Sequence, residues 1–140
     1  MKKNSRIHAV IRLSRHRERA AKAKHADNLR RLEEARSQFV DAQHRASVED
    51  MRADSLDELH RHRMRKALAA QVALGHESDV RDQVEQAVIA QNELHAAMRY
   101  KRTVERIEDR HRKAWAVLAT QAADRAIDDI AIAGWKRRQS

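Results

Sequence analysis

Residues 80–118 of this chain read VRDQVEQAVIAQNELHAAMRYKRTVERIEDRHRKAWAVL, and they lie within a proline-free stretch that runs from Ser55 to Trp135. Apolar side chains return every three or four positions there, as Val80, Val84, Val88, Leu94, Met98, Val104, Ile107, Trp115, Leu118 and Ala122. This spacing is that of one face of an α-helix, whereas a half-buried strand would alternate polar and apolar residues. At ~1.5 Å per residue, a helix of this length reaches roughly 120 Å and needs a partner along it.

The first fifty residues supply a candidate partner helix. Ser5 can cap a helix, and an apolar stripe follows it at helical spacing through Ile7, Val10, Ile11, Ser14, Ala21, His25, Leu29, Leu32, Ala35, Phe39, Ala42 and Ala46. We therefore predict an all-α fold, an elongated antiparallel two-helix coiled-coil hairpin, as a single domain over residues 1–140. Helix one is expected over about 5–50 and helix two over about 55–136. The predicted seam consists of Leu29, Leu32, Phe39, Leu94, Met98, Val104, Ile107, Trp115 and Leu118.

Two positions fit the bend between the helices. At about 50–55, the sequence Ser55-Leu56-Asp57-Glu58 has the form of a capping box, in which Glu58 returns a hydrogen bond to the amide of Ser55. Alternatively, at about 74–79, Gly75 could end one helix and Ser78 or Asp79 could cap the next. The first bend leaves helix two longer, with its C-terminal third overhanging, and the second gives arms of nearly equal length.

The composition excludes most globular classes. Charged residues make up 36% of the chain and aromatic residues 3%, with two glycines and no proline or cysteine. The net charge is +9 in total, divided into +9 over residues 1–31, −5 over 32–98 and +5 over 99–140. Folding back would bring two basic ends together and leave an acidic bend. No uninterrupted apolar run suits a membrane span or a secretory signal, so we expect a cytosolic protein.

Motifs for chemistry are not found in the sequence. None of the nine histidines lies four residues from another, and no His-Glu-x-x-His zinc arrangement occurs. Two glycines cannot build a phosphate-binding loop, and the acidic pair Asp128-Asp129 is adjacent along the chain. We expect no enzyme activity, no catalytic residues, no cofactor, no metal and no small-molecule substrate.

Binding to a partner is the more promising kind of function. Arg12, Arg15 and Arg19 recur at three- and four-residue spacing and so form one basic stripe on helix one. Arg137 and Arg138 form a second basic group near the other end of the chain. Trp135 beside them is interpreted as a hydrophobic clamp on helix one or an anchor for a partner, with the clamp favoured.

Three segments of the chain resemble FliJ, the coiled-coil component of the bacterial flagellar type III export apparatus, and its YscO-type relatives in injectisomes. The segment RIHAVIRLSRHRERAAKAK is similar to that family's opening helix. Residues Ala96 to Ala114, AAMRYKRTVERIEDRHRKA, resemble its basic signature and the motif after it, and Asp128-Asp129-Ile130-Ala131 resembles a motif near its C-terminus. The spacing back from Val104–Arg110 places the family's bend near Ser55, which favours the first of the two bends.

The resemblance implies a non-enzymatic stalk for protein transport in flagellum biogenesis and motility. Such a stalk inserts into the hexameric export ATPase and links it to the membrane export gate, with export chaperones as possible further partners. It would be cytoplasmic and peripherally associated with the inner membrane. The alternatives are a generic coiled-coil scaffold and a basic helical nucleic-acid-binding protein. Nucleic acid is the weaker partner because stacking aromatic residues are scarce.

Overall fold

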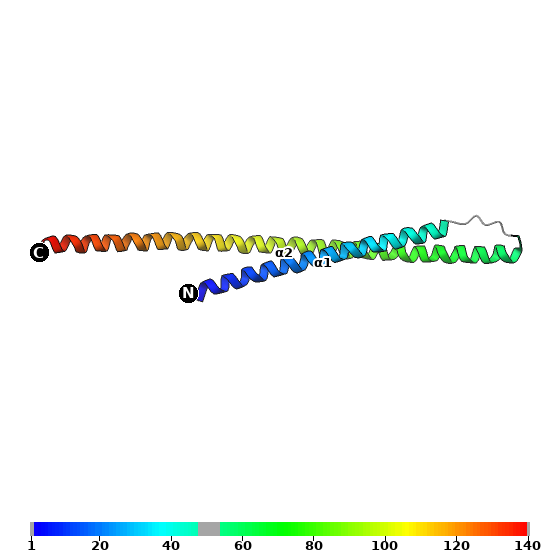
Figure 1. Ribbon diagram of the computed structural model, residues 1–140, viewed down its shortest axis with the longest axis horizontal. Coiled ribbons are helices and arrows are strands. Elements are labelled where there is room, and N and C mark those ends of the chain that lie inside the picture. Colours follow the sequence, from blue (N-terminus) through cyan, green and yellow to red (C-terminus); the bar gives the residue numbers. More distant parts are fainter. Residues whose placement is uncertain (1, 48–53, 140) are drawn as a thin grey trace. The chain divides into compact units, whose positions relative to one another are not determined.

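The computed structural model describes residues 2–47 and 54–139, and the side chains of residues 6–47 and 54–138. It contains two helices, α1 over Lys2–Ser47 with 46 residues and α2 over Leu56–Gln139 with 84 residues (Figure 1). The helices pack against each other as a hairpin, which confirms the predicted all-α class. The helix bounds lie within three residues of the predicted ones, 5–50 and 55–136.

The contacts between the helices divide into two compact units. The first unit comprises Met1–Arg15 with Arg99–Ser140, and the second comprises His16–Met98. Within the first unit, Val10 shares a hollow with Val104 and Ile107. Within the second, Lys24 Nζ lies 2.7 Å from Glu93 Oε2. Low numbers on α1 meet high numbers on α2, so the two helices are antiparallel.

The contact between the helices follows the alternating three- and four-residue spacing of a coiled coil. On α1, the buried and half-buried side chains include Ile7, Ile11, Ser14, Glu18, Ala21, His25, Asn28, Leu32, Ala35, Phe39, Ala42 and Ala46. On α2 they include Leu59, His62, Ala69, Ala73, His76, Val80, Gln83, Ala87, Ala90, Leu94, Ala97, Lys101, Val104 and Glu108. Alanine and polar residues dominate these seams, so the apolar core is thin.

Two buried polar side chains of the α1 seam find partners nearby. The fully buried Ser14 donates its hydroxyl hydrogen bond to the carbonyl of Ile11 at 2.8 Å. The buried carboxylate of Glu18 lies 3.0 Å from Lys22 Nζ, one turn later on α1. Because a buried polar group without a hydrogen bond is costly, these local contacts make a polar seam tolerable.

Five predicted seam residues, Leu32, Phe39, Leu94, Met98 and Val104, are buried or half-buried. The prediction differs from the structure at the other four positions. Leu29 and Ile107 are nearly half exposed, because their neighbours Asn28 and Glu108 hold the seam positions. Trp115 and Leu118 are more than half exposed, because α1 begins near Trp115 and the chain beyond it on α2 has exposed side chains.

The first of the two predicted bends fits the helix bounds. Residues 48–53 lie outside the described part of the chain, and α2 begins directly after Ser55. The amide of Glu58 donates to Ser55 Oγ at 3.2 Å, as a capping box predicts. The return bond differs, because Glu58 Oε2 accepts from the amide of Asp54 and not from Ser55. Residues 74–79 are continuous helix through Gly75, so the alternative bend is wrong.

Candidate functional site

Beyond the hollow that Ile7 and His8 share with Trp115, no described side chain of α1 covers the C-terminal part of α2. Ile7, near the start of α1, already lies beside Ile107 in a shared hollow. All side chains from Asp109 to Ala133 are exposed. In Figure 1 the orange and red end of α2 continues past the start of α1, within the first compact unit. We call residues 114–138 the arm, and it corresponds to the overhang expected from a bend near Ser55.

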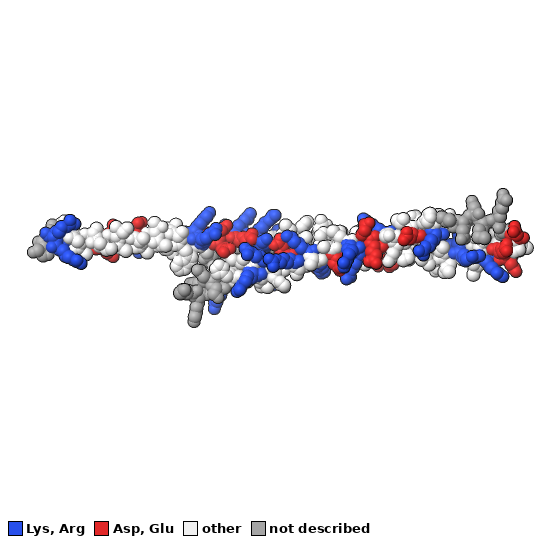
Figure 2. Space-filling view, in the orientation of Figure 1, with Lys and Arg blue, Asp and Glu red and all other residues white. Residues whose placement is uncertain are grey.

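The arm is apolar despite its exposure. Fifteen of the 22 residues 114–135 are apolar. Its large apolar side chains are 53–72% exposed, namely Trp115, Val117, Leu118, Ile127, Ile130, Ile132 and Trp135. Figure 2 shows this part of α2 mostly white, with a blue group at its end. A contiguous exposed apolar surface of this kind marks an interaction site on a folded protein.

Apolar side chains leave the arm on opposite sides of the helix. Successive residues are about 100° apart around an α-helix, so Ile130 and Ile132 point in nearly opposite directions. Charged residues occupy one side only, the side shared by Asp124, Arg125, Asp128 and Asp129. The opposite side carries no charge from Trp115 to Ala133 and presents Trp115, Ala119, Ala122, Ala126, Ile130 and Ala133 at three- and four-residue spacing. We call this second side the uncharged face.

The arm ends in a basic tip formed by Lys136, Arg137 and Arg138 in the last turn of α2. Positive charge there is favoured by the helix dipole, and Arg138 Nε also donates to the carbonyl of Gly134 at 3.4 Å. Trp135 next to the tip is 58% exposed. This exposure does not fit the predicted clamp of Trp135 on helix one, and its role as an anchor for a partner stays a prediction.

The predicted basic stripe lies on α1. Arg12, Arg15 and Arg19 are all exposed, and helical spacing places them along one edge of the seam residues Ile11 and Ser14. Arg12 and Arg15 belong to the first compact unit and Arg19 to the second. The other predicted pair, Arg137 and Arg138, is exposed on α2, so the structure places the two basic groups on different helices.

A hollow in the second unit was not predicted. Its floor is apolar, formed by Ala42, Leu68, Ala69 and Val72, and its volume is about 350 Å³. Arg45 and Arg65 also line it, together with Gln38, Asp41 and His76. The sequence signal was the four-residue spacing of Met64, Leu68 and Val72. These apolar residues form a row on the helix surface next to the seam residues. This hollow suits a partner segment that has an apolar side chain and a carboxylate next to each other.

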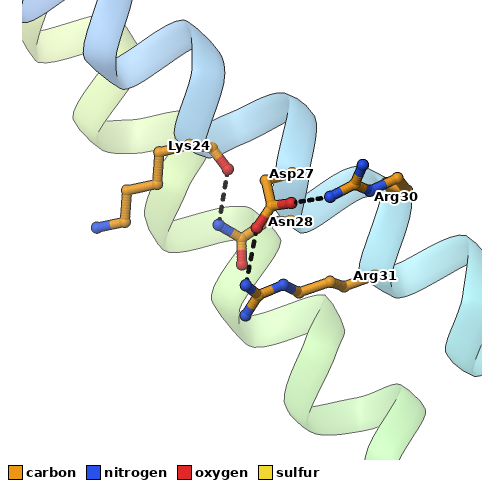
Figure 3. Close-up of polar contacts among 5 residues, drawn as sticks. All are labelled: Lys24, Asp27, Asn28, Arg30 and Arg31. Carbon is orange, nitrogen blue, oxygen red and sulfur yellow. Dashed lines mark hydrogen bonds and ion pairs between the residues drawn. The ribbon is translucent and has the colours of Figure 1, made fainter.

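Ion pairs lie beside the thin apolar seam in the middle of the hairpin. Figure 3 shows Asp27 between two arginines of the same helix, with Oδ1 paired to Arg30 and Oδ2 2.9 Å from Arg31. Asn28 Nδ2 donates to the carbonyl of Lys24 at 2.8 Å, and the ammonium of Lys24 points away from this group. The ammonium of Lys24 pairs with Glu93 on α2. This charge pair links the two helices and favours their observed register.

The described residues offer little for chemistry. No group of three or more His, Cys, Asp or Glu side chains within residues 6–47 and 54–138 could hold a metal ion. Over their described residues, neither α1 nor α2 contains a segment that is both long enough and apolar enough to cross a membrane. Three surface features remain as candidate sites: the arm with its basic tip, the basic stripe and the apolar hollow.

Comparison with known proteins gives no identification. No protein-family model, no curated protein and no solved structure matches this chain.

Proposed function

We propose that this chain is a non-enzymatic stalk or adaptor of a type III protein export apparatus, at the cytoplasmic face of the inner membrane. Its arm inserts into a ring-shaped partner, the hexameric export ATPase, and the opposite end of the hairpin contacts the export gate. The family resemblance supplies the identity of both partners. The arm supplies the physical argument for insertion.

The observation that carries the proposal is the arm, which is apolar on opposite sides and uncovered by α1. A single helix packed beside the arm would cover Ile130 or Ile132, but not both. The side that carries Ile132 also carries Asp124 and Asp128, and the apolar side chains on both sides are buried together only when other protein surrounds the helix. The central channel of a ring surrounds an inserted helix, so a ring is the kind of partner that buries both sides at once.

Charge gives the insertion a direction. The basic tip enters first, and the basic stripe of Arg12, Arg15 and Arg19 follows on α1. Complementary charge raises the rate of encounter and opposes wrong partners. The ring is therefore expected to present acidic side chains toward both groups, and its binding of the stalk should weaken as salt screens them.

The apolar hollow in the second unit is the candidate contact for the second partner. It lies between the C-terminal part of α1 and the N-terminal part of α2, which are the parts next to the bend. Arg45 and Arg65 would pair with a carboxylate while the apolar floor takes a side chain of the same segment.

The test measures the activity of a purified hexameric export ATPase with and without the full-length chain. We expect the chain to stimulate the ATPase. The triple variant Arg12→Glu, Arg15→Glu, Arg19→Glu should keep its helical circular dichroism and lose the stimulation, because reversed charges repel an acidic surface. A matched control, Arg61→Glu, Arg63→Glu, Lys66→Glu, changes the net charge equally at exposed positions near the bend and should still stimulate.

Two substitutions in the arm test the insertion itself. Ile130→Asp and Ile132→Asp, on opposite sides of the arm, should each weaken binding to the ring by at least about tenfold, because each places a charge against a surrounding apolar surface. Failure of the wild-type chain to bind or stimulate the ATPase would contradict the proposed function. Normal stimulation by the basic-stripe variant would remove that stripe from the mechanism.

A further inference from the structure

The uncharged face of the arm continues the surface that α2 presents to α1. The seam of α2 runs through Leu94, Ala97 and Val104 to Glu108. After a step of seven residues past His111 and Arg112, three- and four-residue spacing leads through Trp115, Ala119, Ala122, Ala126, Ile130 and Ala133. A helix-packing surface therefore extends beyond the point where α1 stops covering it.

The composition of this face resembles that of the packed seam. Where α1 and α2 meet, alanines dominate, and Ala35, Ala42, Ala87 and Ala90 are buried. Small residues let two helix backbones approach closely, and a large residue fits opposite a small one. The contact between α1 and α2 thus uses the same residue types that are exposed on the uncharged face.

We propose that the occupant of this face is the same face of a second copy, so that two arms pair antiparallel into a homodimer. This inference is independent of the proposed function. A two-fold axis between Ala122 and Ala126 places Trp115 of one arm opposite Ala133 of the other. The same axis places Ile130 near Ala119 and brings the alanines at the centre together. Residue contacts are reciprocal, as a two-fold interface requires.

A parallel pairing lacks these matches. It would set Trp115 beside Trp115 and Ile130 beside Ile130, with alanine beside alanine between them, so the helix separation that suits one contact would leave gaps at the other. It would also bring the two basic tips together, each with Lys136, Arg137 and Arg138. The antiparallel order also sets each tip near Arg110 and Arg112 of the other copy, so the match of large to small side chains, and not charge, favours it.

A hollow lies at each end of the proposed contact. Ile7 and His8 of α1 line it together with Glu108, His111, Arg112 and Trp115 of α2, all within the first compact unit, and its volume is about 250 Å³. Arg137 follows Ala133 by four residues on the uncharged face and so comes opposite this hollow of the other copy. Glu108 there offers a carboxylate to the Arg137 guanidinium, while the neighbouring Arg112 is already paired with Asp109 at 2.6 Å.

The dimer covers the uncharged face alone. Val117, Ile132 and Trp135 lie on the other side of the arm and stay open. This separates the dimer from ring insertion, which engages both sides. The contact between two arms is at the small end of protein interfaces, so we expect a dissociation constant on the order of 10 µM.

The test is sedimentation equilibrium of the full-length chain between about 1 and 200 µM, the range that brackets the expected constant. The wild-type chain should shift from monomer to dimer across this range. Ile130→Asp should weaken the dimer by at least about tenfold, and Ile132→Asp, two residues away, should leave it within about twofold of wild type. Both positions are exposed in the single chain, so neither variant should lose its helical circular dichroism.

Tryptophan fluorescence gives a second measurement of the dimer. In a Trp135→Phe background Trp115 is the remaining tryptophan. Its emission should shift to shorter wavelength as the concentration rises, because it becomes buried against the second arm. A chain that stays monomeric at 200 µM would overturn the proposal. So would a dimer that survives Ile130→Asp, or one that Ile132→Asp disrupts instead.

Discussion

Two parts of α2 are both helical, but one is packed against α1 and the other is exposed. Residues 80–104 contain twelve apolar residues among 25, and the buried Ala87, Ala90 and Val104 lie there. Residues 114–135 contain fifteen among 22, yet all except Gly134 are exposed. The more apolar segment is the more exposed one, so hydropathy does not decide burial in this chain. Burial follows from where α1 lies, and the proposals above give the exposed arm its partners.

The largest expected effect comes from a charge placed where α1 covers α2. Ala90 is 1% exposed, so Ala90→Glu buries a carboxylate without a partner and should lower the free energy of unfolding by about 3 kcal/mol. Ala126→Glu makes the same change in the arm and should stay within about 0.5 kcal/mol. Urea unfolding followed by circular dichroism measures both variants. Equal losses would mean that the arm is covered within the single chain.

Substitutions of two leucines, one in the seam and one on the arm, test the same difference. Leu32 on α1 is buried, and Leu32→Ala should cost about 2–3 kcal/mol through lost apolar burial and the cavity left behind. Leu118 on the arm is more than half exposed, and Leu118→Ala should change the stability by less than about 0.5 kcal/mol. Thermal unfolding of the two variants at low concentration tests this difference, and the reverse order would place the seam on the wrong face of the helices.

A smaller effect is expected at the start of α2. Ser55 Oγ accepts from the amide of Glu58, so Ser55→Ala should cost about 1 kcal/mol. Ser78 lies within the continuous helix at the site of the rejected bend, so Ser78→Ala should be neutral or slightly stabilising, because alanine is the better helix former. A loss at Ser78 and none at Ser55 would move the helix start to the second site.

The smallest effect is expected for the charge pair between the helices. Lys24 and Glu93 meet at 2.7 Å, but both side chains are about half exposed. Glu93→Gln should therefore cost no more than about 0.5 kcal/mol, and high salt should remove even this difference. A loss that salt does not reduce would show that Glu93 supports the seam through packing.

Much of the fold could be predicted from the sequence, because helical spacing over forty residues or more leaves few alternatives. The periodicity of α1 and the capping box at Ser55–Glu58 indicated two helices and the favoured bend. The seam was predicted less well, since Leu29 and Ile107 seemed better seam residues than the adjacent Asn28 and Glu108. Hydropathy favours the leucine and the isoleucine, whereas the register between the helices, set along their whole length, selects the polar neighbours.

The candidate sites were predicted in part. The overhang followed from the bend near Ser55, and the arginine positions were visible as a pattern. The placement of Trp115, Leu118 and Trp135 was not, because a periodic apolar pattern reports that a helix face will be buried and not which molecule buries it. The hollow beside Leu68 was missed for a related reason, since two helices form it together and its residues lie apart in the sequence.

Hydrogen exchange along α2, measured by mass spectrometry at about 1 µM where the arms should be unpaired, tests the central claim most directly. Helix covered by a partner opens rarely, whereas an uncovered helix end opens locally and exchanges fast. We predict strong protection over residues 80–104 and exchange at least about a hundredfold faster over residues 114–138. Equal protection of the two segments in the dilute single chain would show that the arm is covered within the molecule, and would contradict the account.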